Sequence, residues 1–452
     1  MIPNDEVVIV CNTLEKAGYS AYLVGGAVRD LCLGRSPKDW DIATSAKPEQ
    51  IKALFSKTID TGIKHGTVTV MLGSHGYEVT TYRIDGDYSD GRHPDTVSFT
   101  AHILEDLARR DFTMNAMAMT CRGELVDPYN ARNDMKLNAI RCVGNPDDRF
   151  NEDALRMLRA VRFESQFNFY LTAGTASAIS RNVDKLAGIS AERVRDELTK
   201  ILVSDHPDKG LEDAYDLGIT KVVLPEFDTM MACDHENKFH FTDVGHHSLS
   251  VVKGVSPRAT LRWAALLHDV GKPDTKAYDD TKGRYRFIGH PERSVEIANS
   301  ILTRLKFSNA DKIHILKLIK YHDFMSKTPS KLRRFAAEMG KDFFVDFDEL
   351  RRADAYAHRA DYAPIIQEEH DKMAAKIQSY FEDGSAIDIH GLRINGDELL
   401  EIGLRGKQIG EFLDKMLRDC LGQPSLNNNE FLRKQAEKYK IQEDRRASYV
   451  QP

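Results

Sequence analysis

Long hydrophobic runs and closely spaced cysteines are both missing from this sequence. No stretch of about 18 apolar residues occurs, so no membrane-spanning helix is expected. The six cysteines form no CxxC pair, which predicts reduced thiols rather than a disulfide framework or a zinc site. The first residues, MIPNDEVVIV, lack the basic segment of a secretion signal. These absences predict a soluble, cytoplasmic protein without membrane contact.

An excess of positive charge is also missing. The chain has 63 Lys and Arg against 69 Asp and Glu, a net charge of −6. Any contact with RNA would therefore need a locally basic groove, because the total charge attracts no phosphate. With 41% hydrophobic and 29% charged residues, the composition excludes disordered and collagen-like classes.

The 452 residues are enough for two to four domains, since a common domain has about 150 residues. The first third alternates helical and β-branched segments, with a short strand at 22–24 and strands near 68–72 and 78–83. After about residue 145, apolar residues follow helical spacing. We predict an α+β fold, in which a small mixed-sheet head precedes an extended all-α body. We place segments at 1–140, 141–205, 206–345 and 346–452.

Two aspartates stand two residues apart in Asp39-Trp40-Asp41. In an extended strand, residues i and i+2 face the same side, so both carboxylates would lie together. Their repulsion would be relieved by Mg²⁺, which prefers oxygen ligands. Taken alone, such a pair is more often a solvated acidic loop.

A glycine pair lies upstream of these acids, in Val24-Gly25-Gly26-Ala27-Val28-Arg29. Glycines let backbone N–H groups approach a phosphate closely, and Arg29 adds a charged donor. The pattern is neither a dinucleotide-binding GxGxxG nor a Walker A loop. Glu78, on a neighbouring predicted strand, is a candidate third acid. Three acids beside a phosphate loop suit two-metal phosphoryl or nucleotidyl transfer.

The segment GGAVRDLCLGRSPKDWDIAT strongly resembles the signature of class II tRNA nucleotidyltransferases, the CCA-adding enzymes, and of the related bacterial poly(A) polymerases. The resemblance extends over roughly the first 200 residues. It continues through 109–115, 140–144, 149–156 and 192–198.

This resemblance implies a polymerase-β-like catalytic head that adds C, C and A to tRNA from CTP and ATP. It implies triphosphate contacts at Gly25, Gly26 and Arg29, and Mg²⁺ ligands at Asp39 and Asp41. Arg110, Asp111 and Asn115 resemble the segment that holds the ribose. At Asp127-Pro128-Tyr129-Asn130-Ala131 the sequence departs from its relatives, which carry glycine there; asparagine tolerates the positive φ of such a turn.

Residues 152–162 read as one helix with acids in its first turn. Glu152 and Arg156 are then i,i+4 partners. Asp153 and Arg156 would lie three apart on one face, where they could read the edge of C or A. Arg159 and Arg162 would continue a positive stripe toward the nucleotide. The alternative is an amphipathic helix with solvated arginines.

The loop from Asp85 to Asp95 is similar to a family segment that accompanies addition of the terminal A. Its matching residues are Asp85, Tyr88, Asp90, Arg92 and Pro94. Its presence favours full CCA addition over CC addition. An enzyme that adds only A, or A repeatedly, is the alternative within the family.

A second set of residues resembles the HD phosphohydrolase superfamily. His247, His268, Asp269 and Asp354 match its mononuclear ligand set, and His290 and His322 match the second-metal or phosphate position. Imidazoles and carboxylates suit Mn, Fe, Ni or Zn. This domain would hydrolyse a phosphate ester or serve only as a scaffold.

The C-terminal segment from Leu392 to Leu413 looks like the family's tRNA-binding tail. Its basic residues could equally form a solvated helix face; they are Arg433, Lys434, Lys438, Lys440, Arg445 and Arg446. Two further alternatives place the main function in the HD domain or make the chain a catalytically inactive RNA-binding module. The sequence predicts no oligomeric state.

Overall fold

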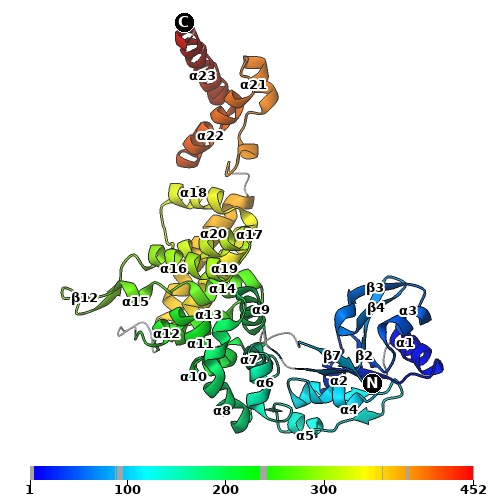
Figure 1. Ribbon diagram of the computed structural model, residues 1–452. Helices are drawn as coiled ribbons and strands as arrows, with labels where there is room; N and C mark the ends of the chain where they lie inside the picture. The colour runs from blue at the N-terminus through cyan, green and yellow to red at the C-terminus, as the bar shows by residue number, and fades with distance from the viewer. Residues whose placement is uncertain are drawn as a thin grey trace. The chain divides into compact units, whose positions relative to one another are not determined.

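The computed structural model describes residues 5–86, 88, 95–234, 242–358, 360–382 and 386–450 (Figure 1). The chain forms two compact units. Unit 1 consists of Met1–Thr229, Pro257–Ala259 and Ser300–Ser308; unit 2 consists of Met230–Ser256, Thr260–Asn299 and Asn309–Pro452. Across the described ranges, every helix is too short or too polar to cross a membrane.

A seven-stranded mixed sheet forms the centre of the head, in the order β3-β4-β5-β2-β1-β8-β9. The strands are β1 (Ala21–Val24), β2 (Asp41–Thr44), β3 (Thr58–Gly62), β4 (Thr67–Leu72), β5 (His75–Thr81), β8 (Ala118–Met119) and β9 (Leu125–Val126). Strand β2 runs parallel to β5 and antiparallel to β1, so Asp41 lies between Glu78 and Val24.

Short helices and turns surround this sheet. They are α1 (Asp5–Lys16), α2 (Gly26–Cys32), α3 (Pro48–Leu54), η1 (Ile63–His65), α4 (Ile103–Ala108), η2 (Thr113–Asn115) and α5 (Ala131–Lys136). Strands β6 (Arg83–Asp85) and β7 (Val97–Phe99) pair separately. Helix α5 begins after Asn130, whose φ of 56° lies in the left-handed region. Asparagine adopts this conformation more readily than most residues other than glycine.

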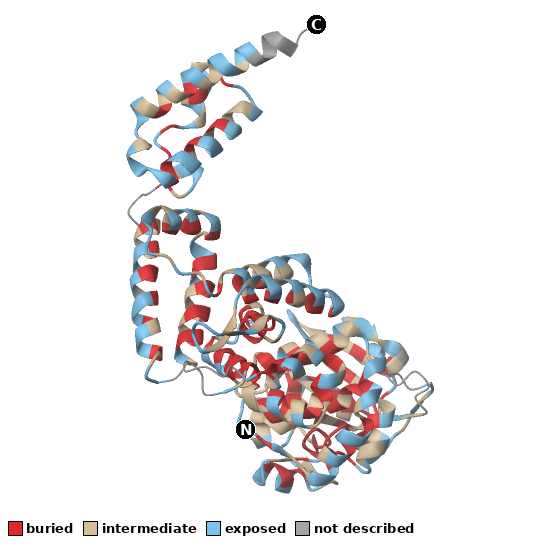
Figure 2. Ribbon diagram, turned by 90° about the vertical axis from the view of Figure 1, so that its left-hand side faces the viewer, coloured by how far each residue is buried: buried red, intermediate tan, exposed pale blue. Residues whose placement is uncertain are grey.

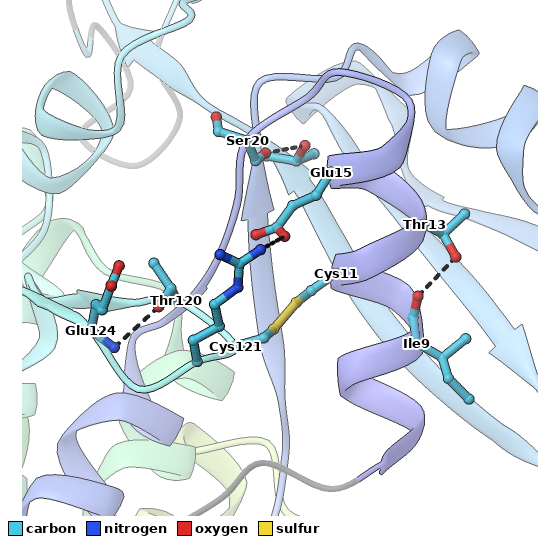
Figure 3. Close-up of a disulfide and its surroundings, with 10 residues drawn as sticks. Ile9, Cys11, Thr13, Glu15, Ser20, Thr120, Cys121 and Glu124 are labelled. Carbon is cyan, nitrogen blue, oxygen red and sulfur yellow. Dashed lines mark hydrogen bonds and ion pairs between the residues drawn. A yellow bond between two sulfur atoms is a disulfide. The ribbon is translucent and has the colours of Figure 1, made fainter.

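Cys11 and Cys121 form a disulfide (Figure 3). The prediction that all cysteines are reduced is therefore wrong for this pair. Cys11 lies on the buried face of α1 with Val7 and Leu14, and Cys121 follows β8. Their sequence separation of 110 residues leaves no local spacing from which the pair could be predicted.

Helices dominate unit 1 after the head. They are α6 (Pro146–Glu152), α7 (Leu155–Phe167), α8 (Ala173–Asn182), η3 (Val183–Gly188), α9 (Ala191–Leu202), α10 (Pro207–Asp216), α11 (Ile219–Val223) and α12 (Pro225–Met231). Strands β10 (Ala139–Ile140) and β11 (Tyr170–Leu171) form a small parallel pair. Helix α7 packs against α9 and α10 and buries Met157, Leu158 and Val161.

Unit 2 is also mainly helical, and buried residues, red in Figure 2, alternate with exposed residues along its helices. Its helices are α13 (Val244–Gly254), α14 (Ala259–Leu267), α15 (Lys272–Thr275), α16 (His290–Arg304), α17 (Asn309–Tyr321), α18 (Pro329–Met339), α19 (Lys341–Tyr356) and α20 (Ala363–Glu382). The first residue of α14 and the last turn of α16, from Ser300 on, belong to unit 1. Strands β12 (Lys276–Asp279) and β13 (Arg284–Phe287) form an antiparallel pair within this helical region. The sequence did not predict this pair, because its aromatic and charged residues alternate over only four positions per strand.

The chain ends in a helical group with its own buried cluster around Leu399, Phe412 and Leu432. It comprises η4 (Ile389–Gly391), α21 (Gly396–Ile402), α22 (Lys407–Gly422), η5 (Pro424–Leu426) and α23 (Asn429–Val450). On α23, Arg433 pairs with Glu398 at 3.2 Å and Lys434 with Glu430 at 2.8 Å. The predicted fold class is confirmed: a mixed-sheet head precedes a helical body.

Candidate active site

A cleft of about 990 Å³ in unit 1 collects the predicted nucleotide-binding residues. Its lining includes Gly25, Gly26, Arg29, Asp39, Asp41, Arg110, Asp111, Asn115, Asp153, Arg156, Arg159 and Arg162. Lys38, Arg109, Phe163, Gln166, Arg193 and Lys200 also line it. These side chains come from the head and from the helices that follow it, so the cleft unites motifs far apart in the sequence.

Gly25, between β1 and α2, lies close to Asp41 of β2 and to Arg110, which follows α4. It caps α2 with a φ of 66°, a conformation that side chains other than glycine rarely adopt. A Cβ atom there would lie 3.1 Å from Arg110 Nη1 and 3.6 Å from Asp41 Oδ2. The turn after β1 therefore needs glycine both for its backbone and for the approach of these two charged groups.

Asp39 and Asp41 both face this cleft. Burial raises the pKa of the Asp41 carboxyl, and the charges of Glu78 and Asp39 raise it further. Glu78 is the register partner of Asp41 on β5 but does not line the cleft. Carboxylates that repel each other in this way suit a divalent cation, whose charge would reverse the effect.

Arg29 is fixed by several contacts at the edge of the cleft. It donates to Asn115 Oδ1 at 2.9 Å and to Asp30 Oδ1 at 2.8 Å. Its guanidinium also lies 4.7 Å from the ring centroid of Phe167. The arginine is thus held in position before any ligand arrives.

Asp106 orients the two arginines that follow it. This buried carboxylate pairs with Arg109 at 2.7 Å and with Arg110 at 3.1 Å. Burial raises the pKa of Asp106, but the two guanidinium groups outweigh it and lower the pKa below its usual value. Asp106 was not among the predicted residues, although its i,i+3 and i,i+4 spacing to these arginines was a usable signal.

Asp111 accepts hydrogen bonds from three directions. Its donors are the Phe112 backbone N–H at 2.8 Å, Asn115 Nδ2 at 3.0 Å and Arg159 Nη2 at 2.6 Å. Burial opposes the charged form, yet Arg159 and these donors hold the pKa of Asp111 well below its usual range. Asp111 therefore ties the head to α7 as a permanently charged group.

The predicted single helix over residues 152–162 is wrong. Helix α6 ends at Glu152, Asp153 is extended with a φ of −150°, and α7 begins at Leu155. Asp153 Oδ1 accepts from the Leu155 N–H at 3.0 Å, which stabilises the break. Asp153 and Arg156 still line one cleft, but through this break rather than along one helix face.

The arginines of α7 do not form an unpaired positive stripe, because all three have acidic partners. The predicted Glu152–Arg156 pair is present. Arg159 pairs with Asp111, and Arg162 pairs with Glu197 of α9 at 2.9 Å. Arg193 of α9 binds Asp153 Oδ2 at 2.6 Å. Neither Glu197 nor Arg193 was a predicted site residue, because partners 35 and 40 residues away leave no local pattern.

Part of the loop from Asp85 to Asp95 is described. Tyr88 donates to Asp85 Oδ2 at 2.8 Å, and the same oxygen lies 3.4 Å from Arg109 Nη1. Burial and the Asp85 charge raise the pKa of Tyr88 to about 12. Asp90, Arg92 and Pro94 lie outside the described residues.

Unit 2 holds a second, buried collection of predicted residues, here called the HD centre. Within the ranges that the structure describes, His247, His268 and Asp354 form one group whose ligand atoms all lie within 4.8 Å of one another. Asp269, His290 and His322 form another such group. Asp269 joins the two, since its oxygens lie 3.1 Å from His268 Nε2 and 3.3 Å from His290 Nε2.

Backbone carbonyls orient three of these histidines. The Nδ1 atoms of His268, His290 and His322 lie 2.8, 2.8 and 2.6 Å from the carbonyl oxygens of Ala265, Phe287 and Ile319. When each Nδ1 carries the proton and donates it to the carbonyl, each Nε2 presents a lone pair to the centre. That arrangement is the one a metal ion requires.

Two carboxyl groups of the HD centre, those of Asp269 and Asp354, favour the charged form that binds a cation. Burial opposes ionisation of Asp269, but His268 and Lys272 hold its pKa well below the usual value. Burial also opposes ionisation of Asp354, and His247, His358 and Arg351 lower its pKa in the same way. Among the described residues, the buried Nε2 of His268 and both oxygens of Asp269 make no well-aligned hydrogen bond. Their nearest neighbours are the other charged groups of the centre, such as Lys272 Nζ at 2.6 Å from Asp269 Oδ2, and a bound ion is one partner that would complete their contacts.

Comparison with known proteins matches three segments of the chain to family models. The poly(A) polymerase head domain matches residues 21–141, and a probable RNA-binding region of polymerase A matches residues 168–231. An HD domain matches residues 240–394. A solved CCA-adding enzyme of Bacillus stearothermophilus, in complex with CTP, is 28% identical with a TM-score of 0.72, and 98% of each chain is covered.

The chain carries a poly(A) polymerase head domain and an HD domain, and it is similar to CCA-adding enzymes.

Curated relatives that this chain matches include the CCA-adding enzymes of Lactobacillus helveticus and Levilactobacillus brevis. They are 50% identical over 218 residues and 49% identical over 218 residues. Each match covers 48% of this chain, and 54% or 55% of the relative. The chain thus spans about half the length of the curated relatives it matches. A Thermotoga maritima CCA-adding enzyme complexed with tRNA shares the fold, with 20% identity and a TM-score of 0.59. Nucleotidyltransferase heads and HD domains generally depend on metal ions, and the HD centre brings two groups of such ligands together.

Proposed function

We propose that this protein adds C, C and A to the 3′ end of tRNA, using CTP and ATP and releasing pyrophosphate. One observation carries the proposal: the Gly25 turn, the Asp41 carboxylate and the Arg110 guanidinium converge in one cleft. Such a turn can receive a triphosphate next to acids that hold its cation. The curated relatives that match this head are named CCA-adding enzymes, which favours this activity over repeated A addition.

Asp39 and Asp41 are the proposed Mg²⁺ ligands, with Glu78 as the third acid. Bound Mg²⁺ would lower the pKa of the attacking hydroxyl and offset the charge of the leaving pyrophosphate. Gly25, Gly26 and Arg29 hold the triphosphate, and Arg110, Asp111 and Asn115 form the ribose side. Asp111 is charged and fully engaged by its donors, so its role is to hold this wall of the cleft rigid.

Asp153 and Arg156 are the proposed readers of the base. A carboxylate can accept from the exocyclic amine of C or A, whereas U and G present a carbonyl oxygen there. Arg193 holds Asp153, and Arg156 donates to the carbonyl oxygens of Arg149 at 3.1 Å and Arg109 at 3.3 Å. These contacts hold both side chains in place, so the carboxylate and the guanidinium are positioned before the base binds.

The remaining segments fit contact with tRNA. We assign 1–140 to catalysis, 141–205 to base selection, 206–345 to the body with the HD domain, and 346–452 to tRNA binding. The match of residues 168–231 to an RNA-binding region supports this arrangement. We propose the cytoplasm as its location, because the curated relatives that it matches are bacterial enzymes.

Extension of a tRNA transcript that ends at position 73 tests the main activity. With all four nucleotides present, we expect two C residues and one A to be added and extension to stop. CTP alone should give two additions, and UTP or GTP alone should give none. Repeated A addition with ATP alone would show the poly(A) alternative instead.

A second activity follows from the HD centre: metal-dependent hydrolysis of a phosphate ester, with Mn, Fe, Ni or Zn. The ligands proposed for the first ion are His247, His268, Asp269 and Asp354, with His290 and His322 at the second position. The specific observation is that all six side chains are buried and within ligand distance of a neighbour. Purified protein incubated with each of these metals and a generic phosphodiester tests it; no release of alcohol with any of them would contradict it.

A further inference from the structure

A pocket of about 390 Å³ opens directly onto the HD centre. Two of its lining residues also contact Asp269: Lys272 Nζ lies 2.6 Å from Oδ2, and His290 Nε2 lies 3.3 Å from Oδ1. A molecule in this pocket would therefore reach the second group of metal-ligating side chains. Most of the other lining residues belong to β13 and the turn that follows it.

The pair of strands β12 (Lys276–Asp279) and β13 (Arg284–Phe287), here called the ribbon, has two different faces. The register places Tyr278 opposite Tyr285, and Lys276 opposite Phe287. Because residues two apart share a face, the aromatic rings lie on one side of the ribbon. On the other side, Arg286 pairs with Asp279 at 3.0 Å.

Two lysine ammonium groups lie near the aromatic rings of this face. Lys276 Nζ lies 4.6 Å from the ring centroid of Tyr285, and Lys272 Nζ lies 5.6 Å from that of Phe287. The rings of Tyr278 and Tyr285 are 5.2 Å apart, and Tyr278 is 55% exposed. Stacking surfaces interleaved with cations are the arrangement by which proteins hold nucleotides without reading their sequence.

We propose that the ribbon is the nucleotide-binding element of the HD centre. Tyr285 stacks on the base, and Lys272 and His290 receive the phosphate beside Asp269. This inference rests on the proposed hydrolase activity and assigns the residues that hold the base of a nucleoside phosphate, either free or at the end of an RNA chain. Inorganic phosphate or a simple sugar phosphate would leave the aromatic face unused.

Steady-state hydrolysis tests the inference with substrates that differ only in the base. The substrates are adenosine 5′-monophosphate and ribose 5-phosphate, each with the metal that supports hydrolysis. For Tyr285→Ala, we expect KM for the nucleotide to rise at least about fivefold, because a base stacked on an aromatic ring is lost. Neither kcat nor the KM for ribose 5-phosphate should change. Tyr285→Phe keeps the stacking surface and should behave as wild type.

Tyr170→Ala is the matched control, because Tyr170 in unit 1 also carries a lysine over its ring, at 4.3 Å. It should leave every constant unchanged. An equal rise of KM for both substrates, or no rise for the nucleotide, would overturn the assignment. A ribo-oligonucleotide with a terminal phosphate should have a KM equal to that of the mononucleotide if free nucleotides are the substrate, and a lower KM if RNA ends are.

Photo-crosslinking gives a readout that needs neither metal nor turnover. The metal-free full chain is irradiated with 8-azidoadenosine monophosphate, and labelled peptides are sequenced by mass spectrometry. We expect label on residues 284–287, absent in Tyr285→Ala and retained in Tyr170→Ala. If hydrolysis occurs but this segment stays unlabelled, the inference fails while the hydrolase activity stands. If the segment is labelled but no phosphate ester is hydrolysed, the activity fails while nucleotide binding at the ribbon stands.

Discussion

The cleft of unit 1 and the HD centre of unit 2 both suit divalent cations, but they are built in opposite ways. In the cleft, Asp39 is exposed and Asp41 half-buried, and the buried acids nearby are already neutralised by arginines. In the HD centre, six histidines and aspartates are buried together, and their ligand atoms face one another within 4.8 Å in each group.

This difference indicates where each ion's remaining ligands come from. An open pair of carboxylates cannot enclose Mg²⁺, so water and the phosphates of a substrate would complete its coordination. A buried set of imidazoles and carboxylates can hold a transition metal with protein atoms alone. We therefore expect the cleft to bind its metal with the nucleotide, and the HD centre to keep its metal without one.

The largest effect is expected from a substitution in the cleft that should leave the HD centre intact. Asp41→Ala should lower nucleotide addition at least about a thousandfold. The reason is that the Mg²⁺ that activates the hydroxyl and offsets the phosphate charge would lose a ligand. Binding of tRNA and hydrolysis at the HD centre should remain. Asp60→Ala removes an exposed carboxylate of the same sheet, paired with Lys52 at 2.9 Å, and should retain wild-type extension. Near-normal extension by Asp41→Ala would refute the metal role.

The second prediction concerns a substitution in the HD centre that should leave nucleotide addition intact. Asp269→Ala removes the residue that joins both ligand groups, so bound transition metal and phosphate-ester hydrolysis should both be lost. Extension of tRNA should stay within about twofold of wild type, since the two catalytic sites use different residues. Metal content is measured by mass spectrometry of the purified protein.

Asp346→Ala serves as the control for this variant. It breaks another histidine–aspartate pair of unit 2, 2.7 Å from His314 Nε2, outside the HD centre. Metal content should stay normal. Equal metal loss in both variants would mean that Asp269 acts on folding rather than as a ligand.

A smaller effect is expected for base selection. The double change Asp153→Ala and Arg156→Ala should reduce discrimination of C and A against U and G about tenfold or more, the scale of one two-point base contact. The readout is the ratio of kcat/KM values in single-nucleotide extension. Removal of the exposed pair Asp147 and Arg181 by alanine should leave selection unchanged. Unaltered selection in the first variant would exclude the two residues as base readers.

The smallest expected effect concerns stability and pH. The folded-state pKa of Asp111 lies below its ordinary value of 3.8, so its stabilisation is present above about pH 4 and is lost as the pH falls further. Asp111→Asn should therefore lower the free energy of unfolding by about 2 kcal/mol at pH 7. The gap to wild type should close below pH 4. Urea unfolding at a series of pH values measures it, and a gap independent of pH would contradict the charge argument.

The sequence was most informative where the chemistry lies on neighbouring residues. Strand periodicity and a glycine turn are local signals, and the structure places Asp39, Asp41 and the Gly25 turn in one cleft. The histidines of the HD centre were also predicted together, although the backbone carbonyls that orient them could not be. The family resemblance supplied the order of the motifs, which residue spacing alone would not have fixed.

Features that depend on distant partners were missed. Asp153 looked like a residue within a helix, but its contacts with Arg193 and the Leu155 N–H favour a break at that position. Cys11 and Cys121 pair only because α1 packs beside the end of β8. Glu197 gains its partner Arg162 only through the packing of α9 on α7.

A crystal structure of the full chain with Mn²⁺ and a non-hydrolysable CTP analogue would test the central claim most directly. Anomalous scattering locates the manganese ions independently of the protein. We predict manganese bound to the carboxylates of Asp39 and Asp41, with the triphosphate against the backbone of Gly25 and Gly26. Manganese bound elsewhere in unit 1, or a triphosphate that avoids this turn, would contradict the account.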